Sequence, residues 1–375
     1  MGKKLPKRIK RRLVIIFSSL LLLMIGLVCF IKFDTAKAAE FTDNVLRPIL
    51  GAKNVIFLEK IFFNTSDKFQ QISTKERAIR APQFNDDSLN NEMNASGLEL
   101  TTIPVDSGFQ TLKNEGIWKI MKLSSFPDEG VMAYTFIRPD TSRPYSIVTI
   151  AQLDMKKMNL GIVAGIKEPG GKLGNPGPGI VPKEIVESNR LVAAFDGGFQ
   201  YRDGEYGMIV DGKTYLPLRN DLGTIVGYKN GEVKIIDYTG QDLGKDVAFV
   251  RQNCPILIVN GILGVEDVKN KKLWGRTFTS GIYTWRTGMG INKNGNLLFA
   301  VGNSLTPTTL AIALRMAGAE NAIQLDINPN WVRFNIFSPL GNGKYDSIPL
   351  THDLKNGATA YLTGYSKDFF YVYKK

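Results

Sequence analysis

The sequence is poor in cysteine and histidine, two side chains on which many nucleophilic and metal-dependent enzymes rely. Its only cysteines, Cys29 and Cys254, each lie in an apolar run, which argues against an intrachain disulfide and excludes a cysteine-based metal site. His352 is the only histidine among 375 residues, so Ser-His-Asp triads, Cys-His pairs and HExxH zinc motifs are excluded within one chain. We expect no protein metal site and no cofactor, and chemistry carried by carboxylate, arginine, asparagine or tyrosine groups or by a bound ion.

Acidic residues are absent from the first twelve positions, which hold seven lysines and arginines. This tail accounts for more than half of the formal net charge of +12. The other basic residues are scattered and form no patch with interleaved aromatic residues, so we expect no nucleic-acid partner.

Charge of either sign is also absent from residues 13–31, a run of nineteen residues rich in Leu, Ile and Val. As a helix this run would rise about 28 Å, enough to cross a hydrocarbon core of roughly 30 Å. The basic tail, residues 1–12, would stay in the cytoplasm, and the chain after Lys32 would be extracytoplasmic. The alternative is a signal peptide cleaved near Ala36-Lys37-Ala38, but the apolar core of a signal peptide usually has only about 7–15 residues. We predict a single-pass cell-membrane protein whose partner along residues 13–31 is the lipid bilayer.

Composition divides the rest of the chain into two regions. Residues 32–107 contain a stretch with roughly helical spacing, 41–63, followed by a polar linker. Residues 108–375 consist of short β-type runs separated by turn residues, and we predict that they form one domain. Within them, Asn230-Gly231 and Asn294-Gly295 are typical of tight hairpin turns.

One strong helix interrupts the predicted strands. Thr306 is its expected N-cap, Pro307 takes the first helical position and Gly318 ends it. A strand at 322–325 follows directly. We therefore predict an α+β fold with a large mixed or antiparallel sheet and few helices, preceded by one transmembrane helix.

Polar clusters at the ends of apolar strands contain the candidate functional residues. The first is Asp196-Gly197-Gly198, which follows a buried strand at 191–195. The strand delivers a carboxylate at its end, and the two glycines allow the backbone to approach a ligand closely. The alternative is a simple turn in which Asp196 accepts hydrogen bonds from nearby backbone amides.

Two arginines lie on predicted strands beside amide or glycine residues. By alternation, Arg251 and Asn253 project from one face, although an exposed edge strand would present them in the same way. Arg286, Gly288 and Gly290 also share a face, and the two glycines would leave room for an anion beside the guanidinium group. The alternative is a surface arginine on a strand weakened by glycine.

The fourth cluster contains Asp326 and Trp331. Asp326 ends an apolar strand that follows the capped helix, and Trp331 could stack on a sugar ring. The alternative is a turn aspartate next to a core tryptophan. Because sequential elements are usually neighbours, we expect Arg286 and Asp326 to lie in one pocket.

The order of these motifs resembles the phosphodiester glycosidase family, which includes the uncovering enzyme that removes N-acetylglucosamine from a sugar phosphodiester. That family has a strand with NGGF, a strand with RTxxG and a helix ending in AxNAxxLDGG. The corresponding segments here are 195–199, 286–291 and 317–326. The resemblance covers about half of the chain and departs from the family at two places. Asp196 replaces the usual Asn, and residues 327–330 replace the glycine-rich tail after Asp326.

This resemblance implies hydrolysis of a sugar-1-phosphodiester in an envelope or extracellular glycan. The leaving phosphate ester is weakly basic, so such a site needs guanidinium groups on the phosphoryl oxygens and one carboxylate more than it needs a strong general acid. Arg286 and Arg251 would serve the phosphate, and Asp326 would activate water or stabilise an oxocarbenium-like centre. Asp196 and Asn253 would hold sugar hydroxyls or the phosphate. Further predicted substrate contacts come from Gly197, Gly198, Gly288 and Trp331. The alternative function is a non-catalytic envelope module that binds a phosphorylated glycan.

Deletion of residues 1–39 should yield a soluble, folded protein, because the remaining chain has its own apolar strands and a polar segment at its start. Size-exclusion chromatography and circular dichroism of the truncated protein would check this. Insoluble product under several expression conditions, alongside a well-folded full-length protein, would contradict it.

Overall fold

The computed structural model describes residues 41–74, 79–85, 95, 97–170, 176–264, 283–327 and 329–375. The predicted basic tail and membrane span, residues 1–31, lie outside this part of the chain and stay predictions. Among the described residues, none of the helices combines the length and apolar character that a membrane span requires. Residues 41–61 belong to one compact unit, and residues from 62 onward form a second.

The first unit consists of helical segments. A π-helical turn, η1 (Thr42–Leu46), leads into α3 (Arg47–Leu50), and α4 (Ala52–Thr74) begins after a break at Gly51. Gly51 has φ +79°, a left-handed conformation that glycine adopts without a steric penalty. The stretch with helical spacing is therefore divided at Gly51, and α4 continues well into the segment that we predicted as polar linker.

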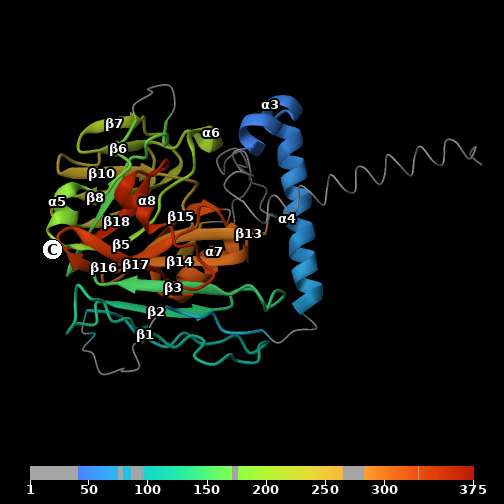
Figure 1. The fold of residues 1–375 in the computed structure, drawn as a ribbon. Helices are drawn as coiled ribbons and strands as arrows, with labels where there is room; N and C mark the ends of the chain where they lie inside the picture. Colours follow the sequence, from blue (N-terminus) through green and yellow to red (C-terminus); the bar gives the residue numbers. More distant parts are fainter. Residues whose placement is uncertain are drawn as a thin grey trace, which may run out of the picture. The chain divides into compact units, whose positions relative to one another are not determined.

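The second unit is built mostly of antiparallel strands, as expected for the predicted α+β class, but the strands form three sheets in place of one large sheet. The first sheet has the order β1-β2-β3-β14-β13-β15-β11-β12. Its strands are β1 (Lys119–Ile120), β2 (Met132–Ile137), β3 (Val148–Leu153), β11 (Ile258–Val259), β12 (Ile262–Leu263), β13 (Thr284–Asn292), β14 (Leu297–Leu305) and β15 (Ala319–Ile327). In Figure 1 the green β2 and β3 lie next to each other, in agreement with their antiparallel pairing.

The other two sheets have five strands each. The second sheet, in the order β7-β6-β10-β8-β9, contains β6 (Met208–Val210), β7 (Lys213–Leu216), β8 (Leu222–Tyr228), β9 (Val233–Tyr238) and β10 (Val247–Gln252). The third, in the order β17-β16-β5-β18-β4, contains β4 (Met158–Val163), β5 (Leu191–Asp196), β16 (Phe334–Gly341), β17 (Lys344–Pro349) and β18 (Phe369–Lys374). The helices of this unit besides α4 are α5 (Lys183–Glu187), α6 (Tyr201–Gly204), α7 (Pro307–Met316) and α8 (Ala358–Thr363).

Local sequence signals explain several of these elements. The Asn230-Gly231 and Asn294-Gly295 turns connect β8 to β9 and β13 to β14, so both predicted hairpins are confirmed. The predicted helix is α7, with a capping box between Thr306 and Thr309 and Pro307 at its start. These features satisfy backbone donors that would otherwise be left without partners at the helix N-terminus.

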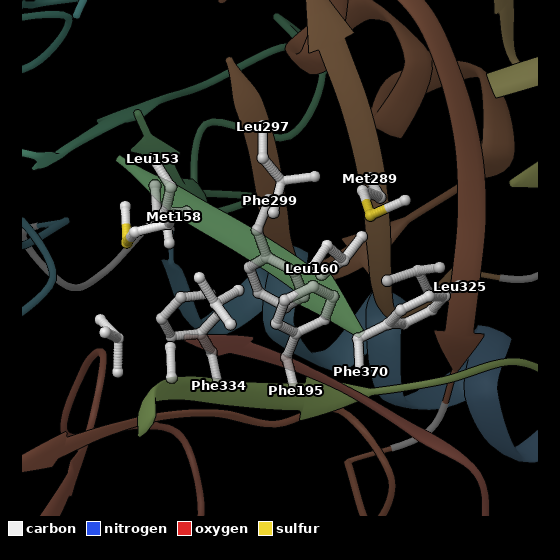
Figure 2. Close-up of a cluster of buried hydrophobic side chains, with 14 of the residues drawn as sticks. Leu153, Met158, Leu160, Phe195, Met289, Leu297, Phe299, Leu325, Phe334 and Phe370 are labelled. Atoms are coloured by element: carbon white, nitrogen blue, oxygen red, sulfur yellow. The ribbon is translucent and has the colours of Figure 1, made fainter. Parts of the chain in front are cut away.

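The hydrophobic core draws on all three sheets. Phe195 of β5 stacks on Phe334 and Phe370 of the neighbouring strands, with ring centroids 5.6 and 5.5 Å apart. Phe299 of the first sheet packs on Phe195 at 5.1 Å, and Phe249 of the second sheet approaches Phe370 at 6.2 Å. Figure 2 shows Phe195, Phe299, Phe334 and Phe370 gathered between their strands. Aromatic pairs of this kind stabilise the core beyond their buried area.

A buried ion pair links the second and third sheets. Arg251 at the end of β10 donates from Nε and Nη2 to the two carboxylate oxygens of Asp368, at 2.8 and 3.2 Å. Its remaining N–H groups donate to the carbonyl oxygens of Phe199, Tyr206 and Gln252. Arg251 and Asp368 are 1% and 0% exposed, so this guanidinium has every donor satisfied inside the protein.

Replacement of Asp368 by Asn should destabilise the protein by about 3–5 kcal/mol, because Arg251 would keep its charge in the interior without a counter-ion. Urea denaturation of the full-length protein, followed by tryptophan fluorescence, measures this loss. Lys183→Gln, which removes an exposed pair with Glu187, is the matched control and should change the free energy of unfolding by less than about 0.5 kcal/mol. An equally small effect of Asp368→Asn would show that the buried pair does not hold the sheets together.

Candidate active site

Antiparallel pairing in the third sheet brings several polar residues to one sheet end. The end of β5 pairs with the beginnings of both its neighbours, with Asp196 opposite Phe369 of β18 and Phe195 opposite Phe334 of β16. The residues just before those two strands, Lys367-Asp368 and Arg333, therefore lie beside the Asp196 end of β5. The strand order itself thus assembles carboxylate and cationic groups from distant parts of the chain.

Asp196 is buried and held by two donors. Its Oδ1 accepts the backbone N–H of Arg333 at 2.9 Å, and its Oδ2 accepts the hydroxyl of Thr287 in β13. Burial, followed by the negative charge of Asp326, raises the pKa of Asp196 to about 8. Asp196 is therefore largely protonated at neutral pH.

A β-bulge directs Asp326 toward the same place. Arg286 pairs with Ile327 and Gly288 pairs with Gln324, so two residues of β15, Leu325 and Asp326, lie opposite the single residue Thr287. The backbone N–H of Asp326 donates to Thr287 Oγ1 at 2.9 Å. Bulges commonly redirect a side chain next to a functional site, and here Thr287 connects the two aspartates.

Asp326 forms a buried ion pair with Lys367. Lys367 Nζ donates to Asp326 Oδ2, and Asp326 Oδ1 accepts the backbone N–H of Ile327 at 2.8 Å. Burial raises the pKa of Asp326, and the Lys367 charge opposes that rise. Burial alone would lower the pKa of Lys367, but its interactions with Asp326, Tyr365 and Asp368 together outweigh burial, so the net shift is upward and Lys367 stays protonated. The direct contact favours the ionised form of Asp326. Trp331 covers this pair, with Lys367 Nζ 4.8 Å from a ring centroid.

The two carboxyl groups thus have different environments although they interact with each other. Asp196 has only a hydroxyl and a backbone amide as donors and is held neutral, whereas Asp326 contacts an ammonium group. Two titratable groups whose surroundings separate their protonation states can divide the acid and base roles of a reaction. We therefore define Asp196, Thr287, Asp326 and Lys367 as the carboxylate cluster.

Arg286 does not share a pocket with Asp326, so this prediction is wrong. Arg286 directly precedes Thr287 in β13, and adjacent residues of a strand point to opposite faces. Its Nε donates to the carbonyl of Leu305 at 2.7 Å, and its Nη1 donates to Gln324 Oε1 at 3.0 Å. Burial lowers the pKa of Arg286 to about 9. The guanidinium group is fully buried on the face that α7 covers.

The room predicted beside Arg286 is also filled. A Cβ atom added to Gly288 would lie 3.0 Å from Leu314 Cδ1 and 3.1 Å from Leu310 Cδ2, both on α7. One added to Gly290 would lie 2.9 Å from Ala319. The glycines therefore allow the helix to pack closely on the sheet, and the vacancy proposed for an anion is occupied by leucine side chains.

Arg251, Asn253 and the two glycines lie behind the carboxylate cluster. Asn253 Nδ2 donates to the carbonyls of Gln324 and Leu325, and its Oδ1 accepts the N–H of Phe199 at 3.3 Å. The backbone N–H of Gly198 donates to Asp368 Oδ2 at 2.9 Å, and Arg251 lies against the position where a Cβ of Gly198 would be. The prediction that Arg251 binds substrate conflicts with its lack of a free donor. These residues hold the turn after β5 in place.

Sequence reasoning missed three residues around the cluster. Thr287 lies on the face of β13 opposite Arg286, as strand alternation requires, but alternation does not show that its hydroxyl links the two aspartates. Lys367 was missed although a Lys-Asp pair directly before the apolar run of β18 is an unusual place for charge. Arg333 follows Trp331 and could have been found as the nearest cation to that predicted contact.

Comparison with known proteins agrees with the motifs. Residues 189–326 match the family model described as phosphodiester glycosidase, and this segment contains Asp196, Thr287 and Asp326. No curated protein matches the chain.

Solved structures of low sequence identity also match. One is the catalytic domain of zebrafish N-acetylglucosamine-1-phosphodiester alpha-N-acetylglucosaminidase, auto-inhibited by its pro-peptide, with 16% identity and a TM-score of 0.41 over 69% of this chain and 88% of that one. Another is a hypothetical protein from Synechocystis, with 12% identity and a TM-score of 0.35 over 66% of this chain and 63% of that one. Residues 189–326 are thus similar to the phosphodiester glycosidase family, as the order of the motifs predicted.

Proposed function

We propose that this protein hydrolyses a sugar-1-phosphodiester linkage in an envelope or extracellular glycan, while anchored in the membrane through residues 13–31. The observation that supports this function is the carboxylate cluster, in which Asp196 accepts the Thr287 hydroxyl and Asp326 pairs with Lys367, within and beside the segment that matches the phosphodiester glycosidase family. No metal or cofactor is required by this chemistry.

In the proposed reaction Asp326 is the essential carboxylate. As an anion it activates water or stabilises the oxocarbenium-like centre at the sugar carbon. Lys367 holds its carboxylate in position through their ion pair. The departing group is a phosphate ester, which leaves as a weak base and places little demand on a general acid. Trp331, which is partly exposed, offers an apolar face for the sugar ring.

Asp196 takes a different role, which explains the departure from the family motif. A protonated aspartate is a neutral group with one donor and one acceptor, as the side chain of asparagine is. Because burial keeps Asp196 protonated at neutral pH, it can donate a hydrogen bond to the substrate from the position where the family usually has Asn. Ionisation of Asp196 would instead place a second negative charge beside Asp326.

Non-catalytic binding of a phosphorylated glycan is the second candidate function. Asp196 and Asp326 are each 2% exposed. A module that only binds a glycan would not need water to reach their carboxyl groups. Turnover separates the two functions, because a binding module would show saturable binding of the same ligand without release of product.

Asp326→Asn should lower kcat roughly a thousandfold, because the carboxylate that acts in the transition state is removed. The assay uses the full-length protein and a chromogenic sugar-1-phosphodiester. Asp246→Asn, at an exposed turn position directly before β10, is the matched control and should leave kcat unchanged. If the wild-type protein binds the substrate but releases no chromophore, the binding module is supported and the hydrolase is excluded.

Activity should fall as the pH rises through about 8, because Asp196 then loses its proton. Above this pH we expect kcat to decrease roughly tenfold per pH unit. Asp196→Asn should keep turnover near neutral pH and remove this alkaline decrease.

The thermal stability of Asp196→Asn provides a second test of the Asp196 pKa. Since the folded-state pKa of Asp196 lies above its unfolded value of 3.8, its contribution to stability is complete below that value and is lost as the pH rises toward 8. Asp196→Asn should therefore be more stable than the wild type at pH 8, as measured by thermal unfolding. An unchanged alkaline decrease in the variant would remove Asp196 from the mechanism.

A further inference from the structure

Two buried polar atoms next to the carboxylate cluster have no hydrogen-bond partner among the residues that the structure describes. They are Nε of Arg333 and the hydroxyl oxygen of Tyr361, whose side chain is 0% exposed. Buried polar groups in native proteins are almost always paired, since an unpaired one costs free energy of folding. Two such atoms in one region therefore indicate that a polar group of a ligand binds between them in the functioning protein.

The two atoms belong to one site. Arg333 Cζ lies 5.2 Å from the ring centroid of Tyr365, and the Tyr365 ring lies 5.2 Å from that of Tyr361. Burial raises the pKa of Tyr361, and the Arg333 charge opposes this rise. The Asp196 and Asp326 charges also act on Tyr361, so this site adjoins the carboxylate cluster.

The backbone and ring contacts of Arg333 hold its guanidinium in place but use few of its donors. Its backbone N–H is bound by Asp196 Oδ1, and the Tyr365 ring supports its guanidinium group. Within the described part of the chain, the side chain makes one long hydrogen bond, from Nη2 to the carbonyl of Asn330 at 3.5 Å, and no other. Gly357 faces the guanidinium group, where any Cβ atom would collide with it. A planar set of donors thus stays available beside the reaction centre.

Charge balance explains which ligand would fit. Arg251 is neutralised by Asp368, and Lys367 is neutralised by Asp326. Among the described residues, no acid pairs with the side chain of Arg333, and its neighbour Asp196 is protonated at neutral pH. The partly exposed Arg333 is therefore an uncompensated cation, and a guanidinium group with free donors recognises phosphate oxygens in a bidentate manner.

We infer that Arg333 and Tyr361 bind the phosphoryl group of the substrate, in the role first assigned to Arg286. The identity of the ligand as a phosphodiester rests on the proposed function. In this arrangement the guanidinium group and the tyrosyl hydroxyl donate to the non-bridging phosphoryl oxygens. The sugar carbon then lies between the phosphate and the carboxylate cluster.

Binding of inorganic phosphate to the full-length protein, measured by isothermal titration calorimetry, tests this inference without any need for turnover. Arg333→Lys should raise the Kd of phosphate roughly tenfold or more, because a lysine supplies one point charge without a bidentate fork. Tyr361→Phe should raise it roughly threefold to tenfold through the loss of one hydrogen bond. The matched controls Arg315→Lys, at an exposed position of α7, and Tyr238→Phe, in β9, should leave the Kd unchanged.

Tyr361→Phe also separates binding from folding. It removes a hydroxyl that has no partner in the folded protein, so the melting temperature without phosphate should stay the same or rise. If the hydroxyl had only a structural role, the variant would melt earlier and bind phosphate normally. Unchanged phosphate affinity in both Arg333→Lys and Tyr361→Phe would overturn the inference.

The proposed function and this inference can fail separately. Asp326→Asn should abolish turnover and still bind phosphate at least as tightly as the wild type, since it removes a negative charge nearby. Phosphate binding that depends on Arg333 in a protein without turnover would support the inference and reject hydrolysis. Turnover with a KM that is the same in Arg333→Lys and in Arg315→Lys would support hydrolysis and reject this phosphate site.

Discussion

The structure around the site depends on the pairing of buried charge. Arg251 and Asp368 are both withdrawn from water, and each would be costly to bury alone, so the end of β10 and the start of β18 must stay together. Asp368 also binds the N–H of Gly198, which fixes the turn that follows Asp196. The neighbour of Asp368 in sequence, Lys367, is thereby placed against Asp326. One ion pair thus supports the position of a second, which belongs to the reaction centre.

Burial also determines the protonation states that the proposed chemistry uses. Asp196 and Asp326 lie in the same interior, but only Asp326 contacts a cation. Burial raises the pKa of both carboxyl groups, but the Lys367 charge opposes this rise at Asp326, whereas the Asp326 charge raises the pKa of Asp196 further, to about 8. An aspartate at a position where asparagine is usual in the family is compatible with function for this reason, since its neutral form offers similar hydrogen bonds. We therefore expect the departure in sequence to affect the pH range of the site more than its hydrogen bonds at neutral pH.

Strand alternation predicted the correct face for Arg286, but the anion site predicted on that face is wrong. Alternation along β13 correctly placed Arg286 on the face opposite Thr287 and Met289. The glycines on that face indicated open space, but α7 packs there through Leu310 and Leu314. A glycine face accommodates a helix as readily as a ligand, and strand periodicity does not distinguish them. Thr287, on the face that was read as apolar, is the residue that contacts both aspartates.

The sequence by itself determined the features that depend on neighbours along the chain. It predicted the capped helix at Thr306, the two Asn-Gly hairpins, the strands at 191–195 and 322–325, and the resemblance that the family model finds over residues 189–326. Only the tertiary structure decided the division into three sheets, the bulge that turns Asp326, and the meeting of Asp196, Thr287, Asp326 and Lys367. Turn and cap preferences arise from backbone geometry within a few residues, whereas strand order and the pairing of buried charges depend on which distant segments exclude water together.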